Sequence, residues 1–129
     1  HHQFDIDRPG KDSHEHRRAG ATEVMISSTN RWALMHELRG NNDQPLDKLM
    51  EHMSPVDLLI VEGFKWEPHL KIEVHRPSVG KVLLQPDDDN IIAVASDEPL
   101  EGLGVPVLPL DDIVSIADFM LDAVSLKAA

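Results

Sequence analysis

The chain has 129 residues and is acidic, with 23 Asp and Glu against 12 Lys and Arg and a formal net charge of −11. This charge disfavours a nucleic-acid backbone or an anionic membrane as partner, because both would repel it. The absence of cysteine excludes disulfides, thiolate metal sites and a cysteine nucleophile. The length predicts one domain over residues 1–129. The sequence shows no long apolar segment and no signal-peptide pattern, which favours a cytoplasmic protein.

The first half of the chain predicts a helix, a pair of strands and a second helix. Turn residues followed by good helix formers occupy residues 9–21, so we expect a helix there that Asp12 or Ser13 caps and Gly20 ends. Two β-leaning runs, at 22–28 and 31–38, are separated by a short turn and predict neighbouring strands. Apolar residues at helical spacing over 46–53 predict a short amphipathic helix.

The second half alternates apolar runs with turns and ends in a helix. Residues 58–61 and 91–95 are short continuous apolar runs, which predict strands buried on both faces. Residues 69–76 alternate and predict a partly exposed strand, while the prolines of 105–110 confine that extended piece to an edge. Residues 111–126 give the clearest helix, with Asp111 and Asp112 suited to its N-terminus. The alternation predicts an α/β fold with a largely parallel sheet flanked by helices.

Each of the two predicted buried strands ends in a carboxylate. Glu62 follows the first strand and Asp97 the second, so in neighbouring parallel strands both would lie at the carboxyl edge, where open α/β sheets bind ligands. Carboxylate oxygens suit Mg²⁺, which keeps several waters and is shared with phosphates. Gly63 would let the backbone approach a phosphate closely. The alternative is that Glu62 and Asp97 are solvated strand ends.

A phosphate-binding loop would decide between these alternatives, but the sequence contains none. The pattern requires a glycine, four residues and then Gly-Lys-Ser/Thr. The two Gly-Lys pairs, at residues 10–11 and 80–81, lack both the first glycine and the final hydroxyl residue.

Four segments, in order along nearly the whole chain, resemble the molybdopterin-guanine dinucleotide biosynthesis protein B family, MobB. They are HHQFDIDRPGKDSHEHRRAGA (1–21), RWALMHE (31–37), DLLIVEGFK (57–65) and IIAVASDEPL (91–100). A His-His pair precedes D-x-D-x-P-G-K-D-S in that family, so His1 and His2 look native rather than the remainder of a purification tag. The resemblance implies a P-loop NTPase-like fold. It also implies that the N-terminal P-loop βα unit of the family is missing from this chain.

The resemblance further implies a GTP-binding accessory protein in molybdenum cofactor synthesis that assists the MobA guanylyltransferase. We expect at most weak GTPase activity in an intact family member, none in this chain, and a homodimer. A sheet that lacks an interior strand would have an apolar gap, so we also expect association or domain swapping. The alternative function is a nucleotide-free dimerisation or docking module for the enzymes of cofactor synthesis.

The resemblance assigns site residues for GTP and Mg²⁺. Glu62 matches the family's Walker-B-like acid, an indirect Mg²⁺ ligand, with Gly63 beside it. Asp97 lies where related GTPases place an acid that contacts the guanine base. The residues that match the charged segment on the phosphate side are Asp5, Asp7, Lys11, Asp12 and Ser13.

Overall fold

The computed structural model describes residues 7–126, and its internal contacts divide the chain into two compact units. The N-terminal unit is His1–Leu49 and the C-terminal unit is Met50–Ala129. Asp5, His1 and His2 lie outside the described residues. Because the contacts form two units, a single domain over residues 1–129 stays a prediction. Within residues 7–126, no helix is both long and apolar enough to cross a membrane.

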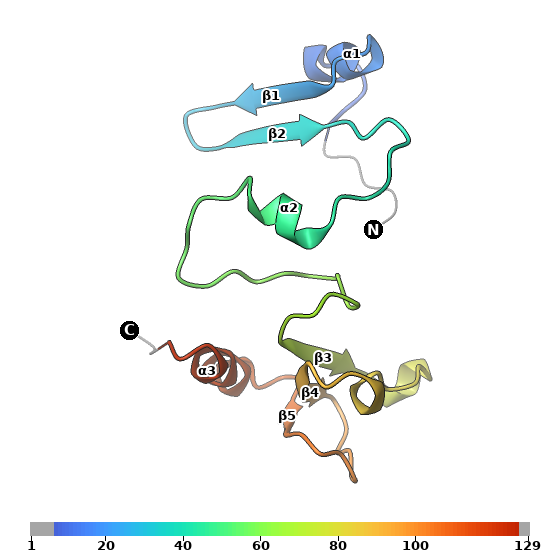
Figure 1. Cartoon of the computed structure of the whole chain (residues 1–129), viewed down its shortest axis with the longest axis vertical. Helices are drawn as coiled ribbons and strands as arrows, with labels where there is room; N and C mark the ends of the chain where they lie inside the picture. The colour runs from blue at the N-terminus through green and yellow to red at the C-terminus, as the bar shows by residue number, and fades with distance from the viewer. Residues whose placement is uncertain (1–6, 127–129) are drawn as a thin grey trace. The chain divides into compact units, whose positions relative to one another are not determined.

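The N-terminal unit is built on an antiparallel hairpin. Strands β1 (Glu23–Ser27) and β2 (Trp32–His36) pair as predicted, with Met25 opposite Leu34. Helix α1 (Asp12–Arg18) packs on β1, and α2 (Leu46–Met50) follows β2 along the chain (Figure 1). Met35 is the buried apolar side chain of the hairpin, at 8% exposed.

The start of helix α1 differs from the prediction. Its N-cap is Lys11, so neither Asp12 nor Ser13 caps it, and no side chain of the N-cap bonds to the first turn. Asp12 and Ser13 are instead the first two residues of the helix, and the Ser13 hydroxyl donates to the Asp7 carboxylate at 2.9 Å. The helix end is as predicted, with Gly20 directly after the C-cap in a left-handed conformation at φ 109°.

The C-terminal unit contains a three-stranded parallel sheet in the order β3-β4-β5. The strands are β3 (Lys71–His75), β4 (Ile91–Ser96) and β5 (Val107–Pro109), with 3₁₀ turns at Pro77–Val79 and Gln85–Asp87 between β3 and β4. The central strand supplies the core, since Ala93 and Val94 are 0% exposed. The predicted α/β fold with a parallel sheet is confirmed, as are the buried strand at 91–95 and the edge strand in 105–110.

Helix α3 (Ile113–Ala123) closes the C-terminal unit and contacts β5 (Figure 1). Asp112 caps it as predicted, accepting from the Ser115 amide at 3.0 Å and from the Ser115 hydroxyl at 2.6 Å. Ile116 and Met120 on its inner face are half-buried. Ile113, in the first turn, is 77% exposed.

The predicted buried strand at residues 58–61 is wrong as the structure has it. The run forms no ladder with any strand in the described part of the chain, and Ile60 is 68% exposed. A strand requires a hydrogen-bonded neighbour, and the two neighbours of β4 are β3 and β5. The prediction that Glu62 and Asp97 end adjacent parallel strands is therefore wrong as well.

Candidate nucleotide site

The carboxyl edge of the parallel sheet carries an ion pair. Strands β3 and β4 end at His75 and Ser96, which are both buried, and the next residue of each is charged. The Arg76 guanidinium donates to the Asp97 carboxylate at 3.1 Å (Nη1 to Oδ2). Asp97 is thus held by Arg76, and a guanine base that used this acid would have to share it with the guanidinium.

Glu62 and Gly63 follow the apolar run 58–61 as an exposed turn. Among residues 7–126 no hydrogen bond or ion pair is formed by the Glu62 side chain, and no three His, Asp or Glu residues cluster as metal ligands. Gly63 has φ 87° and Phe64 φ 48°, so two successive residues adopt left-handed backbone. A Cβ at residue 63 would meet no atom within 4 Å, and the glycine is therefore needed for its conformation.

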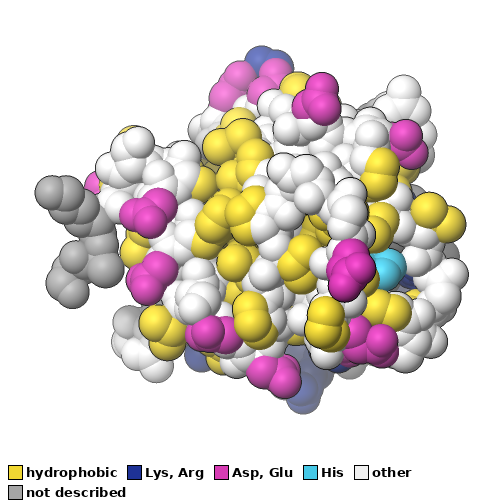
Figure 2. Space-filling view, turned by 90° about the horizontal axis from the view of Figure 1, so that it is seen from below, with side chains coloured by type: hydrophobic (Ala, Val, Ile, Leu, Met, Phe, Trp, Pro, Cys, Tyr) yellow, Lys and Arg dark blue, Asp and Glu magenta, His cyan; other side chains and the backbone are white. Residues whose placement is uncertain are grey.

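An open groove of about 920 Å³ lies between the run 58–63 and strand β3. Its lining is largely apolar, and the charged groups Glu62, Lys65 and Arg76 also border it. Figure 2 shows one face of the molecule on which hydrophobic side chains gather in the middle with acidic side chains around them. The groove therefore combines an apolar lining with charged groups at its border, an arrangement found in ligand sites.

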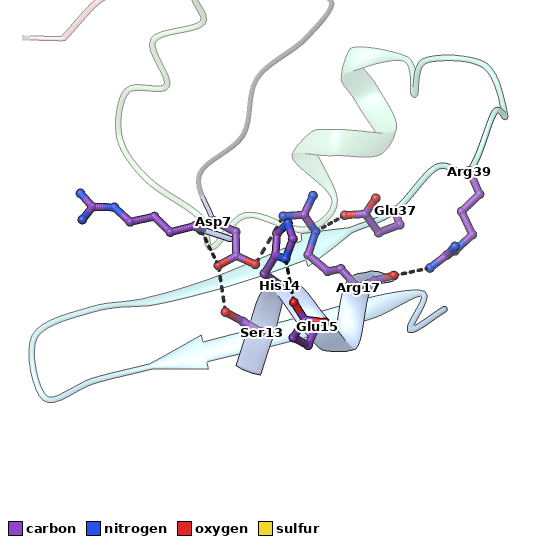
Figure 3. Close-up of polar contacts among 8 residues, drawn as sticks. Asp7, Ser13, His14, Glu15, Arg17, Glu37 and Arg39 are labelled. Atoms are coloured by element: carbon purple, nitrogen blue, oxygen red, sulfur yellow. Dashed lines mark hydrogen bonds and ion pairs between the residues drawn. The ribbon is translucent and has the colours of Figure 1, made fainter. Parts of the chain in front are cut away.

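In the N-terminal unit, Asp7 is the centre of a polar network (Figure 3). Its carboxylate, 4% exposed, accepts from the Arg8 amide and the Ser13 hydroxyl, each at 2.9 Å, and from Arg17 Nη1 at 3.4 Å. Burial opposes ionisation of this carboxyl, but the hydrogen bonds from Ser13, Arg8 and Arg17 outweigh it and lower its pKa. Asp7 and Ser13 thus hold each other and the start of α1 in place.

Arg17 extends this network to the hairpin. Its Nε lies 2.6 Å from Glu37 Oε1, directly after strand β2. Arg39 then donates to the carbonyls of Arg17, at 3.2 Å, and Ala21, at 2.8 Å, at the C-terminal end of α1 (Figure 3). The helix is therefore fixed to the hairpin by guanidinium groups at its last turn.

The predicted site residues fall into two sets, one in each unit. Lys11 and Asp12 are exposed at the start of α1, near the Asp7–Ser13 bond. Glu62, Gly63 and Asp97 belong to the C-terminal unit. The structure brings Asp7 and Ser13 into direct contact. Within the described residues, it does not bring Glu62 and Asp97 into contact.

The basic partners of these acids were not predicted from the sequence. Arg76 follows β3 directly, as Asp97 follows β4, and parallel pairing of His75 with Ser96 places the two side by side. The ion pair could be predicted from the sequence only if β3 and β4 were known to pair in parallel with this register. Arg17 carried no such signal, since Arg18 lies beside it in the same last turn of α1.

The fold and these residues define a class: an α/β protein whose parallel sheet carries an ion pair at its carboxyl edge and an apolar groove along β3. The family described as molybdopterin guanine dinucleotide synthesis protein B, MobB, matches residues 1–97. The chain therefore belongs to this family, and the resemblance inferred from its motifs is confirmed. All predicted site residues lie within the matched range. Membership also supports the predicted accessory role in molybdenum cofactor synthesis.

Two relatives extend this similarity over most of the chain. The chain is 42% identical over 128 residues to the molybdopterin-guanine dinucleotide biosynthesis adapter protein of Escherichia coli (strain K12), covering 95% of this chain and 71% of that protein. It is 38% identical over 122 residues to the protein of the same name from Haemophilus influenzae (strain ATCC 51907 / DSM 11121 / KW20 / Rd), covering 93% of this chain and 66% of that protein. About a third of each relative therefore has no counterpart in these 129 residues.

Proposed function

We propose that this chain is part of an adapter protein that binds GTP with Mg²⁺ and assists a MobA-like guanylyltransferase in making molybdopterin guanine dinucleotide, in the cytoplasm and as a homodimer. The observation that carries the proposal is the family match over residues 1–97, which contains every predicted site residue. The relatives bear the name adapter protein, which fits a role in positioning a ligand for a partner enzyme.

The geometry supports roles for three residues in this proposal. Glu62 presents an exposed carboxylate that could hold Mg²⁺ through water, as hard cations prefer. Gly63 keeps the adjoining backbone in a conformation open to a phosphate. Lys11 is an exposed cation at the N-cap of α1, where it adds attraction for a phosphate.

A titration with a fluorescent GTP analogue and Mg²⁺ tests the proposal. The samples are this chain as wild type, as Glu62→Gln and as Glu101→Gln, and the full-length Escherichia coli relative as wild type and with Gln at the position that aligns with Glu62. Glu101 is exposed and lies outside the matched range, so it is the control in this chain. We expect binding by the full-length protein, competed by GTP and weakened about tenfold or more by the change at the position that aligns with Glu62, since one charge near a bound ion contributes about 1.4 kcal/mol or more.

Binding that is unaffected at Glu62, or no binding by either protein, would overturn the assignment of this acid. The second outcome would favour the nucleotide-free docking module, for which the hairpin supplies a specific observation. Met25, Leu34 and Trp32 lie on one face of β1 and β2 and are 62%, 42% and 65% exposed. Such an apolar face suits a protein partner, including a second copy, and sedimentation of the same samples measures the proposed homodimer.

A further inference from the structure

The ion pair between Arg76 and Asp97 is carried by two well-fixed strand ends. The residues before them, His75 and Ser96, are 9% and 4% exposed and are partners in the parallel register of β3 and β4. A proline follows Arg76 and disfavours helical backbone before it, and Arg76 is accordingly extended, with φ −125° and ψ 106°. The Ser96 hydroxyl accepts from the Glu98 amide at 3.2 Å, which fixes the turn after β4. Both charged side chains therefore leave the sheet from defined positions.

The pair leaves hydrogen-bonding groups open on both of its members. One contact joins them, from Arg76 Nη1 to Asp97 Oδ2, and within residues 7–126 neither side chain bonds to any other group. A guanidinium has several N–H donors and a carboxylate several acceptor positions, so most of both sets is unused. The two side chains are 53% and 29% exposed, so a ligand reaches them from solvent. An ion pair this exposed adds little to stability, so stability alone gives no reason for its placement.

The unused groups complement one edge of a guanine base. Along that edge guanine presents the N2 amine and the N1 hydrogen, which a carboxylate accepts, and then the O6 and N7 acceptors, to which an arginine donates with two N–H groups. The pair holds a carboxylate and a guanidinium side by side, as this edge requires. Adenine has an amine in place of O6 and an acceptor at N1, so it would oppose both members of the pair.

We propose that Arg76 is a specificity-determining residue of the nucleotide site: while bound to Asp97, its guanidinium donates to O6 and N7 of a guanine whose N1 and N2 groups donate to Asp97. The inference rests on the GTP binding proposed above, and it adds a residue and a reason why guanine is chosen. The ion pair does not obstruct the base, because Asp97 keeps Oδ1 and part of the capacity of Oδ2. The pair also lies at the carboxyl edge, where open α/β sheets bind ligands.

Competition against the fluorescent GTP analogue tests the inference with nucleotides that lack single atoms of the base. They are deaza-GTP, which has carbon in place of N7, and ITP, which lacks the N2 amine. The protein is the full-length Escherichia coli relative, as wild type, with Met at the position that aligns with Arg76, and with Met at the position that aligns with Arg31. Arg31 is an exposed arginine of the N-terminal unit and gives the control.

We expect the wild type to bind GTP about tenfold more tightly than deaza-GTP and than ITP, because each analogue loses one of these contacts. The variant at the Arg76 position should bind GTP more weakly and should bind GTP and deaza-GTP equally. It should keep part of its preference for GTP over ITP, which the acid contributes. The control should keep both preferences. If the Met variant does not fold, Lys at the same position replaces it, since Lys keeps the charge but lacks the two parallel donors.

Equal binding of GTP and deaza-GTP by the wild type, or a preference that survives in the variant at the Arg76 position, would overturn the inference and leave GTP binding in place. Loss of the preference over ITP alone in that variant would also overturn it, because Arg76 would then only hold Asp97. Absence of GTP binding by the wild type would overturn both the inference and the proposed function.

Discussion

Strand β4 and the run 58–61 are two apolar stretches of similar composition with different structures. Each is a short series of aliphatic residues with a carboxylate soon after it, Glu62 after the run and Asp97 after β4. Strand β4 has a strand on both sides, and its Val94 is 0% exposed. The run 58–61 has no paired strand in the described chain, and its Ile60 is 68% exposed. Composition therefore establishes that a segment can be a buried strand, and its neighbours decide whether it is one.

The largest effect that we expect comes from a charge placed in each of these stretches. Val94→Asp buries a carboxylate in the centre of the sheet and should destabilise the C-terminal unit by about 4 kcal/mol or more. Ile60→Asp should change the free energy of unfolding by no more than about 0.5 kcal/mol, because the side chain is already in water. Urea unfolding followed by circular dichroism measures both. Equal losses would mean that the run is packed in solution.

The elements predicted well from the sequence are of two kinds. Some are stabilised by residues close in the sequence, and one lies at the centre of the sheet. The hairpin was predictable because two β-leaning runs flank a short turn, and α3 because Asp112 and its helical spacing act within a few residues. Strand β4 was predictable because it is central and buried on both faces, so its composition is nearly continuous apolar.

The predictions failed where residues distant in the sequence determine the local structure. Among the described residues, the run 58–61 has no paired strand, and no local pattern indicates whether one is present. Asp12 or Ser13 was expected to cap α1, but the helix begins one residue earlier than a cap at Asp12 would allow, with Lys11 as its N-cap. Asp97 was expected to face a ligand, and Arg76 from the adjacent strand holds it. For the candidate site, the motifs predicted which residues are involved. Which charged groups contact one another could be seen only in the folded structure.

A second comparison concerns two carboxylates of the C-terminal unit, Glu73 within β3 and Glu98 after β4. Glu73, in the middle of β3, accepts hydrogen bonds from the amides of Leu84 and Gln85, at 2.9 Å each for the shortest contacts. Glu73→Leu leaves two partly buried amides without an acceptor and should cost about 1–2 kcal/mol of stability. Glu98→Leu, at an exposed residue after β4, is the control and should change little. The two urea midpoints check this, and equal values would show that water replaces the carboxylate fully.

The smallest effect concerns the acid dependence of the strand start. Lys71, the first residue of β3, donates to Asp88 at 2.9 Å. This bond, with that from the Asn90 amide, lowers the pKa of the Asp88 carboxyl against the opposing effect of burial. A carboxyl whose folded-state pKa is depressed contributes stability above its unfolded value, about 3.9, and the contribution is lost as the pH falls through the folded value.

Lys71→Met should therefore flatten the acid dependence. The urea midpoint of the wild type should fall between about pH 6 and about pH 3, and that of the variant should fall by less, because its Asp88 loses the largest cause of its lowered pKa and keeps only the hydrogen bonds from Asn90. The carboxyls of Asp7 and Asp112, whose pKa values are also lowered, contribute equally to both proteins and cancel in the difference. Lys81→Met, at an exposed lysine, is the matched control. Identical pH profiles for Lys71→Met and the wild type would show that the Asn90 amide alone maintains the ionised Asp88, and that the ion pair does not anchor the start of β3.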